Sequence, residues 1–321
     1  MIETTSEIQL NGRSKVLSSK KIKGPLLITN DYVFKKVFSF KEILASFLSA
    51  YFCFQILENE IEVENPILGP IKINDKISIP DLKLTITINS NVFGRFNVEM
   101  QTTSNAYLHK RFQFTTCKLY VEQMSSGQNY SILNKSCGIV IYSVNHFDDN
   151  ICLHKFALYD KENELEYEDS IEIHSLEILK RDQLLQNKSP EDVERLKPLY
   201  KWLKFFDSKT EEDYMEAAQG NAGMENAWNK IQIMSRSDEE REIAEAVDLR
   251  KADEIAHFKT GYKKGYQKGE IKGQIKGEIN GEKKKEREIV TKMLLKNMPI
   301  DDIVDFCNIT KEKIKEIQQS L

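Results

Sequence analysis

The sequence predicts a mixed α/β domain followed by an all-helical region. Strand patterns gather between residues 60 and 101 and again between 137 and 179, helical patterns flank them, and residues 190–257 carry no strand pattern. The 321-residue chain is 30% charged and 40% apolar, which is a globular composition. It is long enough for one large core and a helical appendage.

The N-terminal elements come first. Residues 1–28 are polar and predict a flexible leader. A helix should begin near Asn30 or Asp31, because either side chain can cap its N-terminus. An apolar helix is expected over residues 41–57, and strands over residues 60–100, where three prolines limit strand length.

The second half of the α/β region follows the same logic. An amphipathic helix is expected over residues 105–125. The continuous apolar run 137–144 is typical of a buried central strand. Residues 153–158 and 171–179 are two further strand candidates.

The most informative part of the chain is a pair of predicted strands, residues 79–83 and 96–101, separated by turn residues at 89–91. Side chains alternate along a strand, so Asp81 and Lys83 share one face, and Glu99 and Gln101 share another. If the strands pair as a hairpin, these groups converge. Two carboxylates on adjacent strands can hold Mg²⁺, which activates water and stabilises charge on a phosphodiester.

Several motifs occur in a fixed order and together resemble the PD-(D/E)XK nucleases, most closely the branch of recombination-promoting nucleases and transposases. The resemblance covers about residues 29–181. The residues that carry it are Asn30-Asp31-Tyr32-Val33-Phe34-Lys35-Lys36-Val37-Phe38, Pro80-Asp81, Glu99-Met100-Gln101, Arg111, Tyr120, Gln123, Gly127, Tyr130 and Ile173-His174-Ser175-Leu176-Glu177-Ile178-Leu179-Lys180.

The resemblance implies a restriction-endonuclease-like sheet flanked by helices and a Mg²⁺-dependent DNA endonuclease associated with recombination or transposition, whose product carries a 5′-phosphate. It implies metal ligands at Asp81, Glu99 and the Met100 carbonyl. Asp31 is either a further metal ligand or an N-cap. The general PD-(D/E)XK pattern has lysine where this chain has Gln101, although the branch that it resembles most also carries Glu-Met-Gln. Glutamine can orient water but brings no charge.

Two basic residues complete the predicted site. Lys83 either supplies the charge that Gln101 lacks or simply extends into water. Arg111 either contacts a phosphate or pairs with a surface acid. The missing lysine keeps an alternative open, a catalytically inactive DNA-binding or scaffold protein with the nuclease fold. An RNase is a weaker third interpretation, because the chemistry does not choose the sugar.

Composition excludes several other classes. The net charge of −4 argues against a wholly basic nucleic-acid binder, so DNA contact must come from local patches. No apolar stretch is long enough to span a membrane, and no signal peptide is evident. The five cysteines are scattered without metal-ligand spacing, which favours a cytoplasmic protein without disulfides. The five histidines also lack such spacing, which argues against a histidine-dependent mechanism.

The C-terminal part divides into a helical region at 182–258, a glycine repeat at 259–287 and a small helical tail at 288–321. Ser237 to Glu240 matches a capping box that opens a charged helix. Glycine then recurs every fourth residue from Gly261 to Gly281. Six glycines would cost a helix about 6 kcal/mol relative to alanine, so an isolated helix here is doubtful.

The repeat is also basic. Residues 259–287 contain ten basic and four acidic residues, a net charge of +6. Lysines with the same period of four could track a phosphate backbone, namely Lys264, Lys268, Lys272 and Lys276. Three interpretations stay open: self-association into a homo-oligomer, a flexible connector, and a repeat without a role. The tail resembles a helix-turn-helix, with a small capping bundle as the alternative.

Overall fold

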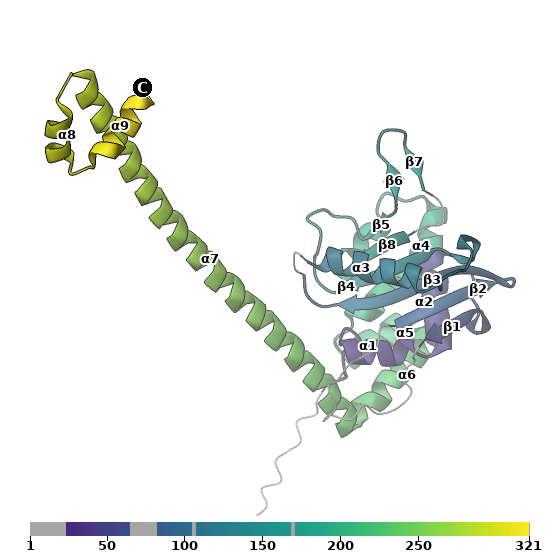
Figure 1. Cartoon of the computed structure of the whole chain (residues 1–321). Helices are drawn as coiled ribbons and strands as arrows, with labels where there is room; N and C mark the ends of the chain where they lie inside the picture. The colour runs from purple at the N-terminus through teal and green to yellow at the C-terminus, as the bar shows by residue number, and fades with distance from the viewer. Residues whose placement is uncertain (1–23, 65–81, 105–106, 168–170, 321) are drawn as a thin grey trace, which may run out of the picture. The chain divides into compact units, whose positions relative to one another are not determined.

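The computed structural model describes residues 24–64, 82–104, 107–167 and 171–320 (Figure 1). The chain forms two compact units, Met1–Leu249 and Arg250–Leu321. In the described ranges, no helix has an apolar stretch long enough to cross a bilayer.

The first unit is built on a mixed six-stranded sheet in the order β1-β2-β3-β4-β8-β5. β1, β2 and β3 pair antiparallel, β3, β4 and β8 pair parallel, and β5 returns antiparallel to β8. The sheet confirms the predicted class. The strands are β1 (Ile61–Glu64), β2 (Leu82–Ile88), β3 (Asn91–Gln101), β4 (Ser136–Tyr142), β5 (Leu153–Phe156) and β8 (Ile171–Glu177).

A hairpin is present around the predicted turn, but its first strand, β2, runs from Leu82 to Ile88, whereas residues 79–83 were predicted and residues 79–81 lie outside the described ranges. Asn89 and Ser90 adopt positive φ angles of 50° and 65° between β2 and β3, a conformation that suits a two-residue hairpin turn. Leu82 lies opposite Val98, and Lys83 lies opposite Asn97. A second, two-stranded hairpin joins β6 (Tyr159–Asp160) to β7 (Leu165–Glu166).

One face of the sheet carries the main core. Aromatic side chains of α1 (Asp31–Phe38) and α2 (Lys41–Phe52) pack with Trp202 and Phe206 of α4 (Pro190–Asp207) against apolar residues of the central strands. α2 is shorter than predicted, because Cys53 takes a left-handed conformation that ends the helix. Asn30 caps α1 by accepting hydrogen bonds from the backbone N–H groups of Tyr32 and Val33.

The other face of the sheet is covered by α3 (Leu108–Val121). Leu108 and Phe112 of α3 pack on Val140 and Tyr142 of β4. The strand side chains on this face also include a polar row, which is described below. The amphipathic helix predicted over 105–125 is confirmed, with narrower bounds.

The helical segment from residue 182 to about residue 249 belongs to the same core. Buried residues of α5 (Glu211–Ala218), α6 (Ala222–Arg236) and the start of α7 (Asp238–Leu295) join the cluster formed with α1, α2 and α4. Ser237 caps α7 by accepting the N–H of Glu240. The Glu240 carboxylate does not complete the predicted capping box, since it contacts Tyr32 and Lys36 of α1.

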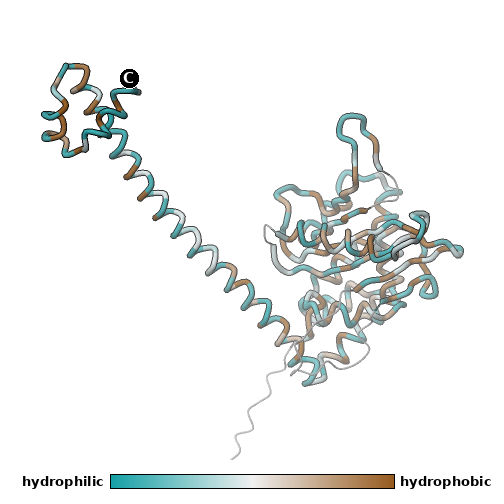
Figure 2. Tube along the Cα trace, viewed as in Figure 1, coloured by the Kyte–Doolittle hydropathy of each residue, from teal (hydrophilic) through white to brown (hydrophobic). Residues whose placement is uncertain are grey.

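The glycine repeat is helical, contrary to the expectation from its glycine content. α7 (Asp238–Leu295) runs without a break through all six glycines. A continuing helix needs no new nucleus, and the intervening Lys, Glu and Gln residues have high helix propensity. The repeat is mostly hydrophilic or neutral (Figure 2), and a Cβ added at any of the six glycines would meet nothing within 4 Å.

The end of α7 packs with α8 (Ile300–Cys307) and α9 (Lys311–Gln319) around a small core centred on Val290, Ile303 and Ile314. Lys311 pairs with Asp301, and Lys313 pairs with Glu286. These ion pairs use two of the α9 lysines that could have faced phosphates. They favour the capping-bundle interpretation of the tail.

Candidate active site on the β3 face beneath α3

Every second residue at the C-terminal end of β3 points toward α3. These residues are Asn97, Glu99 and Gln101, and all three are buried. Val98 and Met100 alternate with them and lie in the main core on the opposite face. The period of two in a strand therefore places a carboxylate between two amides at the predicted site.

Glu99 is the centre of this group, with a relative exposure of only 2%. Its Oε2 accepts a hydrogen bond from Gln101 Nε2 at 3.2 Å. Arg111 Nη2, from the first turn of α3, lies 3.1 Å from Oε1 and 3.0 Å from Oε2. A carboxylate removed from water needs compensation, and a guanidinium and an amide supply it here.

Arg111 contacts a buried acid, so the predicted pairing with a surface acid is not what the structure contains. The Arg111 side chain is itself 53% exposed. It bridges the buried carboxylate and solvent, so it can turn toward a phosphate without unfolding anything around it. Guanidinium groups recognise phosphate and carboxylate oxygens with the same geometry.

Asn97 adds an unsatisfied oxygen to the site. Its Oδ1 is buried and has no hydrogen-bond partner in the described part of the chain. A buried acceptor without a donor is uncommon and is often explained by a bound water or ion. Carboxylate and amide oxygens are the hard ligands that Mg²⁺ prefers, so the donor set around Glu99 fits a divalent cation.

The remaining predicted site residues are distributed as follows. Asp81 lies outside the described residues, immediately before Leu82, the first residue of β2. Lys83 donates to Glu122 Oε2 at 2.8 Å at the end of α3, and this bond lowers the pKa of Glu122. The Asp31 Oδ2 atom lies 3.4 Å from Lys35 Nζ, one turn later in α1. The structure thus joins Glu99, Gln101 and Arg111, and it directs the Lys83 ammonium toward a different carboxylate.

Further polar side chains lie on this face of the sheet, on β4 and β8, the two strands beyond β3. Gln101 of β3 is opposite Tyr142 of β4, which is opposite Glu177 of β8. Glu177 is fully buried and accepts hydrogen bonds from the backbone N–H groups of His146 at 2.6 Å and Phe147 at 3.3 Å. Its Oε2 also accepts from Lys180 Nζ at 2.7 Å.

Lys180 lies in a short 3₁₀ helix, Ile178–Leu184, that follows β8. Burial opposes its charge, but Glu177 and Asp149 outweigh burial and raise the pKa of Lys180. Its ammonium also donates to the Phe147 carbonyl at 2.8 Å. The pair therefore fastens the segment after β4 to the end of β8.

Aromatic stacking also holds the segment after β4, which contains His146, against β4 itself. The His146 ring stacks on Tyr142 with a centroid distance of 4.5 Å and an interplanar angle of 4°. Burial raises the pKa of Tyr142, with the charges of Glu177 and Glu99 as further causes. Burial also lowers the pKa of His146. Both groups are therefore held in their neutral forms near pH 7.

Two groups of potential metal ligands arise that sequence spacing did not predict. Asp149, His154 and Glu177 come together near Lys180, whose ammonium contacts both acids. On the opposite face of the sheet, Cys137, Glu172 and His174 come together.

The second group is already internally bonded. His174 Nε2 contacts Glu172 at 2.7 Å, and its Nδ1 contacts the Tyr51 hydroxyl at 2.6 Å. Burial opposes ionisation of Glu172, but hydrogen bonds from His174 and Lys135 lower its pKa to about 2. Burial raises the pKa of Cys137, which keeps the thiol protonated. We interpret this cluster as a bonded part of the core.

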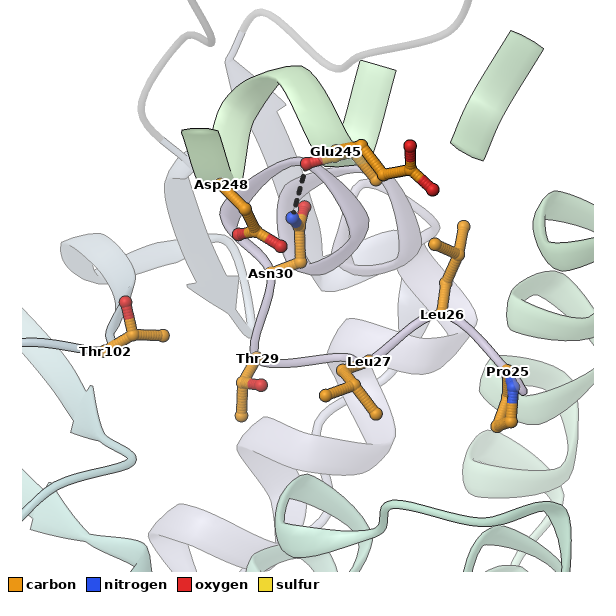
Figure 3. A pocket seen from close by; sticks show the side chains of 9 residues that line it. Pro25, Leu26, Leu27, Thr29, Asn30, Thr102, Glu245 and Asp248 are labelled. Atoms are coloured by element: carbon orange, nitrogen blue, oxygen red, sulfur yellow. Dashed lines mark hydrogen bonds between the residues drawn. The ribbon is translucent and has the colours of Figure 1, made fainter. Parts of the chain in front are cut away.

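A pocket of about 240 Å³ lies beside the start of α1, between the segment before it and the first turns of α7 (Figure 3). Asn30 at its wall donates to the Ala244 carbonyl at 3.0 Å. Its lining includes Thr102, which follows Gln101, and the carboxylates of Glu245 and Asp248. It includes none of Glu99, Gln101 and Arg111, and its acids disfavour a phosphate.

Sequence reasoning missed Asn97, Tyr142 and the Glu177–Lys180 pair as parts of this face. Asn97 could have been found, because it precedes Glu99 by two residues and must share its face. Glu177 and Lys180 stood in a recognised motif but had no assigned role. Their link to Gln101 depends on the order of β3, β4 and β8, which the sequence does not state.

Comparison with known proteins identifies the family of the chain. No curated protein and no solved structure matches the chain. The family model described as "PD-(D/E)XK nuclease family transposase" matches residues 28–261, which is most of the chain and extends well beyond the motifs that suggested it. The chain belongs to the PD-(D/E)XK nuclease family transposases.

Proposed function

We propose that this protein is a Mg²⁺-dependent DNA endonuclease that hydrolyses phosphodiester bonds in recombination or transposition. The family supports a nuclease associated with these processes. The observation that carries the proposal is the buried Glu99 carboxylate, which lies between two amides under a half-exposed arginine. A buried ion pair often adds no stability over apolar residues of the same volume, which favours a functional role for this one.

The residues that would hold the metal are Asp81, Glu99 and the Met100 carbonyl, with Asp31 as a further candidate. When bound, Mg²⁺ would supply an activated water and would stabilise charge on the phosphodiester, and the product would carry a 5′-phosphate. Asn97 Oδ1 is a buried acceptor on the same face, and it is suited to hold a water beside Glu99.

The chain's own groups would divide the remaining work. Gln101 holds the Glu99 carboxylate in place through its amide N–H and can orient water. Arg111 would move its charge from Glu99 to the phosphate of the bound strand, where it would stabilise negative charge. Lys83, which bonds to Glu122, would fix the edge of α3 over the site and would not supply charge to the reaction directly.

The direct test is plasmid nicking by the purified protein with Mg²⁺ and with excess chelator. We expect nicked circles with Mg²⁺, and their loss on chelation. Equal nicking in both conditions, or none in either, would contradict the proposal.

A prediction concerns Gln101. Gln101→Ala should lower the nicking rate about a hundred-fold, the effect of removing one positioned donor, while Gln101→Lys should retain or raise it. Gln113→Ala, an exposed glutamine of α3, is the control and should cleave normally. If Gln101→Ala cleaves at the wild-type rate, the amide does not orient the attacking water.

A second candidate function is a DNA-binding or scaffold protein that lacks catalysis. Arg111 on both Glu99 oxygens favours it, because the carboxylate is already neutralised, and the nearest predicted lysine is bonded to Glu122. Calorimetry with Mg²⁺ separates the two. A nuclease should bind the ion and lose binding in Glu99→Ala, whereas a scaffold should bind none.

The glycine repeat would contribute DNA affinity without chemistry. Replacing Lys264, Lys268, Lys272 and Lys276 with glutamine should leave Mg²⁺ binding unchanged. It should reduce the slope of the logarithm of the DNA-binding constant against the logarithm of the salt concentration by up to about 3.5, since each neutralised phosphate contributes about 0.9. Glutamine at Lys188, Lys197, Lys201 and Lys204 is the matched control and should change the slope little.

Truncation after Phe258, which removes the glycine stripe as well as the lysines, tests the rival use of the repeat, self-association into a homo-oligomer, when its mass by light scattering and its salt slope are both measured. A fall in mass at an unchanged salt slope would assign the repeat to contact between copies. An unchanged slope and an unchanged mass would leave it with neither role.

A further inference from the structure

The outer surface of α3 combines exposed aromatic and apolar side chains with positive charge. Tyr107, at the N-cap position, is 59% exposed, Phe114 is 69% exposed and Val121 is 63% exposed. They are seven residues apart, which is nearly two helical turns, so they form one stripe. The buried residues of α3, including Leu108, Phe112 and Leu119, face the sheet instead.

The charge on this helix has one sign. Leu108–Val121 contains Lys110, Arg111 and Lys118 and no carboxylate. Lys110 is three residues after Tyr107 and Lys118 is four after Phe114, so both lysines flank the stripe. Lys118 has a 3.5 Å ion pair with Glu122, which already serves Lys83, and Lys110 has no ion pair within the described residues. The surface is complementary to an anion.

The same helix carries Arg111 to the Glu99 carboxylate. Whatever lies on the stripe is therefore within a helix width of the proposed cleavage site. A second copy of the chain is a poor occupant, because a symmetric contact through this face would bring Lys110 and Lys118 of two copies together. A polyanion with flat apolar groups is the better chemical match.

We propose that the outer face of α3, defined by Tyr107, Lys110, Phe114, Lys118 and Val121, binds an unpaired DNA strand next to the active site. This inference rests on the proposed nuclease function and names its substrate class as DNA that offers a single-stranded segment, as the unpaired stretches of a supercoiled plasmid do. Exposed aromatic rings stack on bases, and flanking lysines follow the phosphates. In a duplex the base faces are covered by their neighbours, so the rings would have nothing to stack on.

The distance between Tyr107 and Phe114 favours an unpaired DNA strand in an extended conformation over one whose bases are stacked on each other. Tyr107 and Phe114 are about 10 Å apart along the helix, at about 1.5 Å per residue. Stacked bases in a duplex rise about 3.4 Å per step, so two rings at this distance cannot fill neighbouring steps. An unpaired strand can open its bases to meet both.

The fluorescence of a Phe114→Trp variant reports directly whether bases stack on the outer face of α3. The two native tryptophans, Trp202 and Trp228, are buried, so an indole at position 114 would be the exposed emitter. With oligo(dT) and excess chelator, so that no cleavage occurs, its fluorescence should be quenched, and an equal length of duplex should quench it far less. Ile233→Trp is the control, an exposed site on α6 that should not respond to either.

Binding affinity gives an independent readout under the same conditions. Phe114→Ala should weaken oligo(dT) binding about five- to a hundred-fold, the range for loss of one stacked base, and should leave duplex binding within about two-fold. Ile233→Ala should change neither. Phe114→Tyr should restore most of the affinity, because the ring is kept.

Three results would overturn the inference. The first is a Phe114→Trp signal that oligo(dT) does not change. The second is equal weakening of single-strand and duplex binding by Phe114→Ala. The third is a fall in mass by light scattering on Phe114→Ala at unchanged DNA affinity, which would assign the stripe to contact between copies. If the wild-type protein nicks plasmid and one of these results is found for the Phe114 variants, only this inference fails. A wild type that binds no DNA removes the proposed function as well.

Discussion

Replacing Asp81 or Glu99 with alanine should reduce Mg²⁺-dependent nicking about a thousand-fold. The reason is that each carboxylate would hold the metal, whose charge stabilisation is worth several kcal/mol in the transition state, and about 1.4 kcal/mol changes a rate ten-fold. Rates should be measured on supercoiled plasmid at saturating Mg²⁺. Glu216→Ala, an exposed acid of α5, is the matched control and should nick at the wild-type rate.

The fold should survive the loss of the Glu99 carboxylate. Glu99→Ala removes the partner of Arg111, but that arginine is half-exposed and can turn to water, so the melting temperature should change little. Loss of nicking with an intact thermal transition is the expected pattern. Wild-type nicking by either variant, in a preparation free of contaminating nuclease, would mean that the metal is held elsewhere or is not needed.

Glu177→Gln should destabilise the first unit by about 3–5 kcal/mol, the cost of leaving a buried charge without its partner. The Lys180 ammonium would keep the Phe147 carbonyl and the more distant Asp149, at 3.4 Å, but would lose its 2.7 Å bond to Glu177. The backbone N–H groups of His146 and Phe147 would face a weaker acceptor. Urea unfolding measures the change.

A double-mutant cycle tests whether the pair acts as a unit. Glu177→Gln combined with Lys180→Met should cost less than the sum of the single changes, because no unpaired charge is left. The exposed pair Lys204–Glu216 is the matched control, and breaking it should cost less than about 1 kcal/mol. A loss below about 1 kcal/mol for Glu177→Gln would show that water reaches Lys180 and that the segment after β4 is not fastened by this pair.

Much of the first unit could be predicted because its signals are local. Asn30 at a helix start, the Asn89–Ser90 turn and the apolar run of β4 each specify their own conformation within a few residues. The alternation along β3 also places Glu99 and Gln101 on one face from the sequence alone. The period of two follows from the extended backbone of any strand, so it holds whichever strands pair with β3.

The glycine repeat is the case where local reasoning failed. Counting six glycines predicted a doubtful helix, whereas α7 is continuous over 58 residues. The count treated the segment as isolated. In the chain, the helix is already nucleated by packing in the first unit at Ile243 and Val247, and its end is packed at Val290. Propagation from a formed helix costs far less than starting one.

The sequence by itself therefore determined most element types of the first unit, the face of β3 that carries Glu99 and Gln101, and the family. Tertiary structure decided which distant groups lie near that face. Arg111 contacts the Glu99 carboxylate, and Lys83 bonds to Glu122. Glu177, bonded to Lys180, lies on β8 in register with Gln101 across the sheet. The physical reason is that these contacts depend on strand order and on the rotation of α3 about its axis. Both are set by how the two faces of the sheet are covered, which no local pattern records.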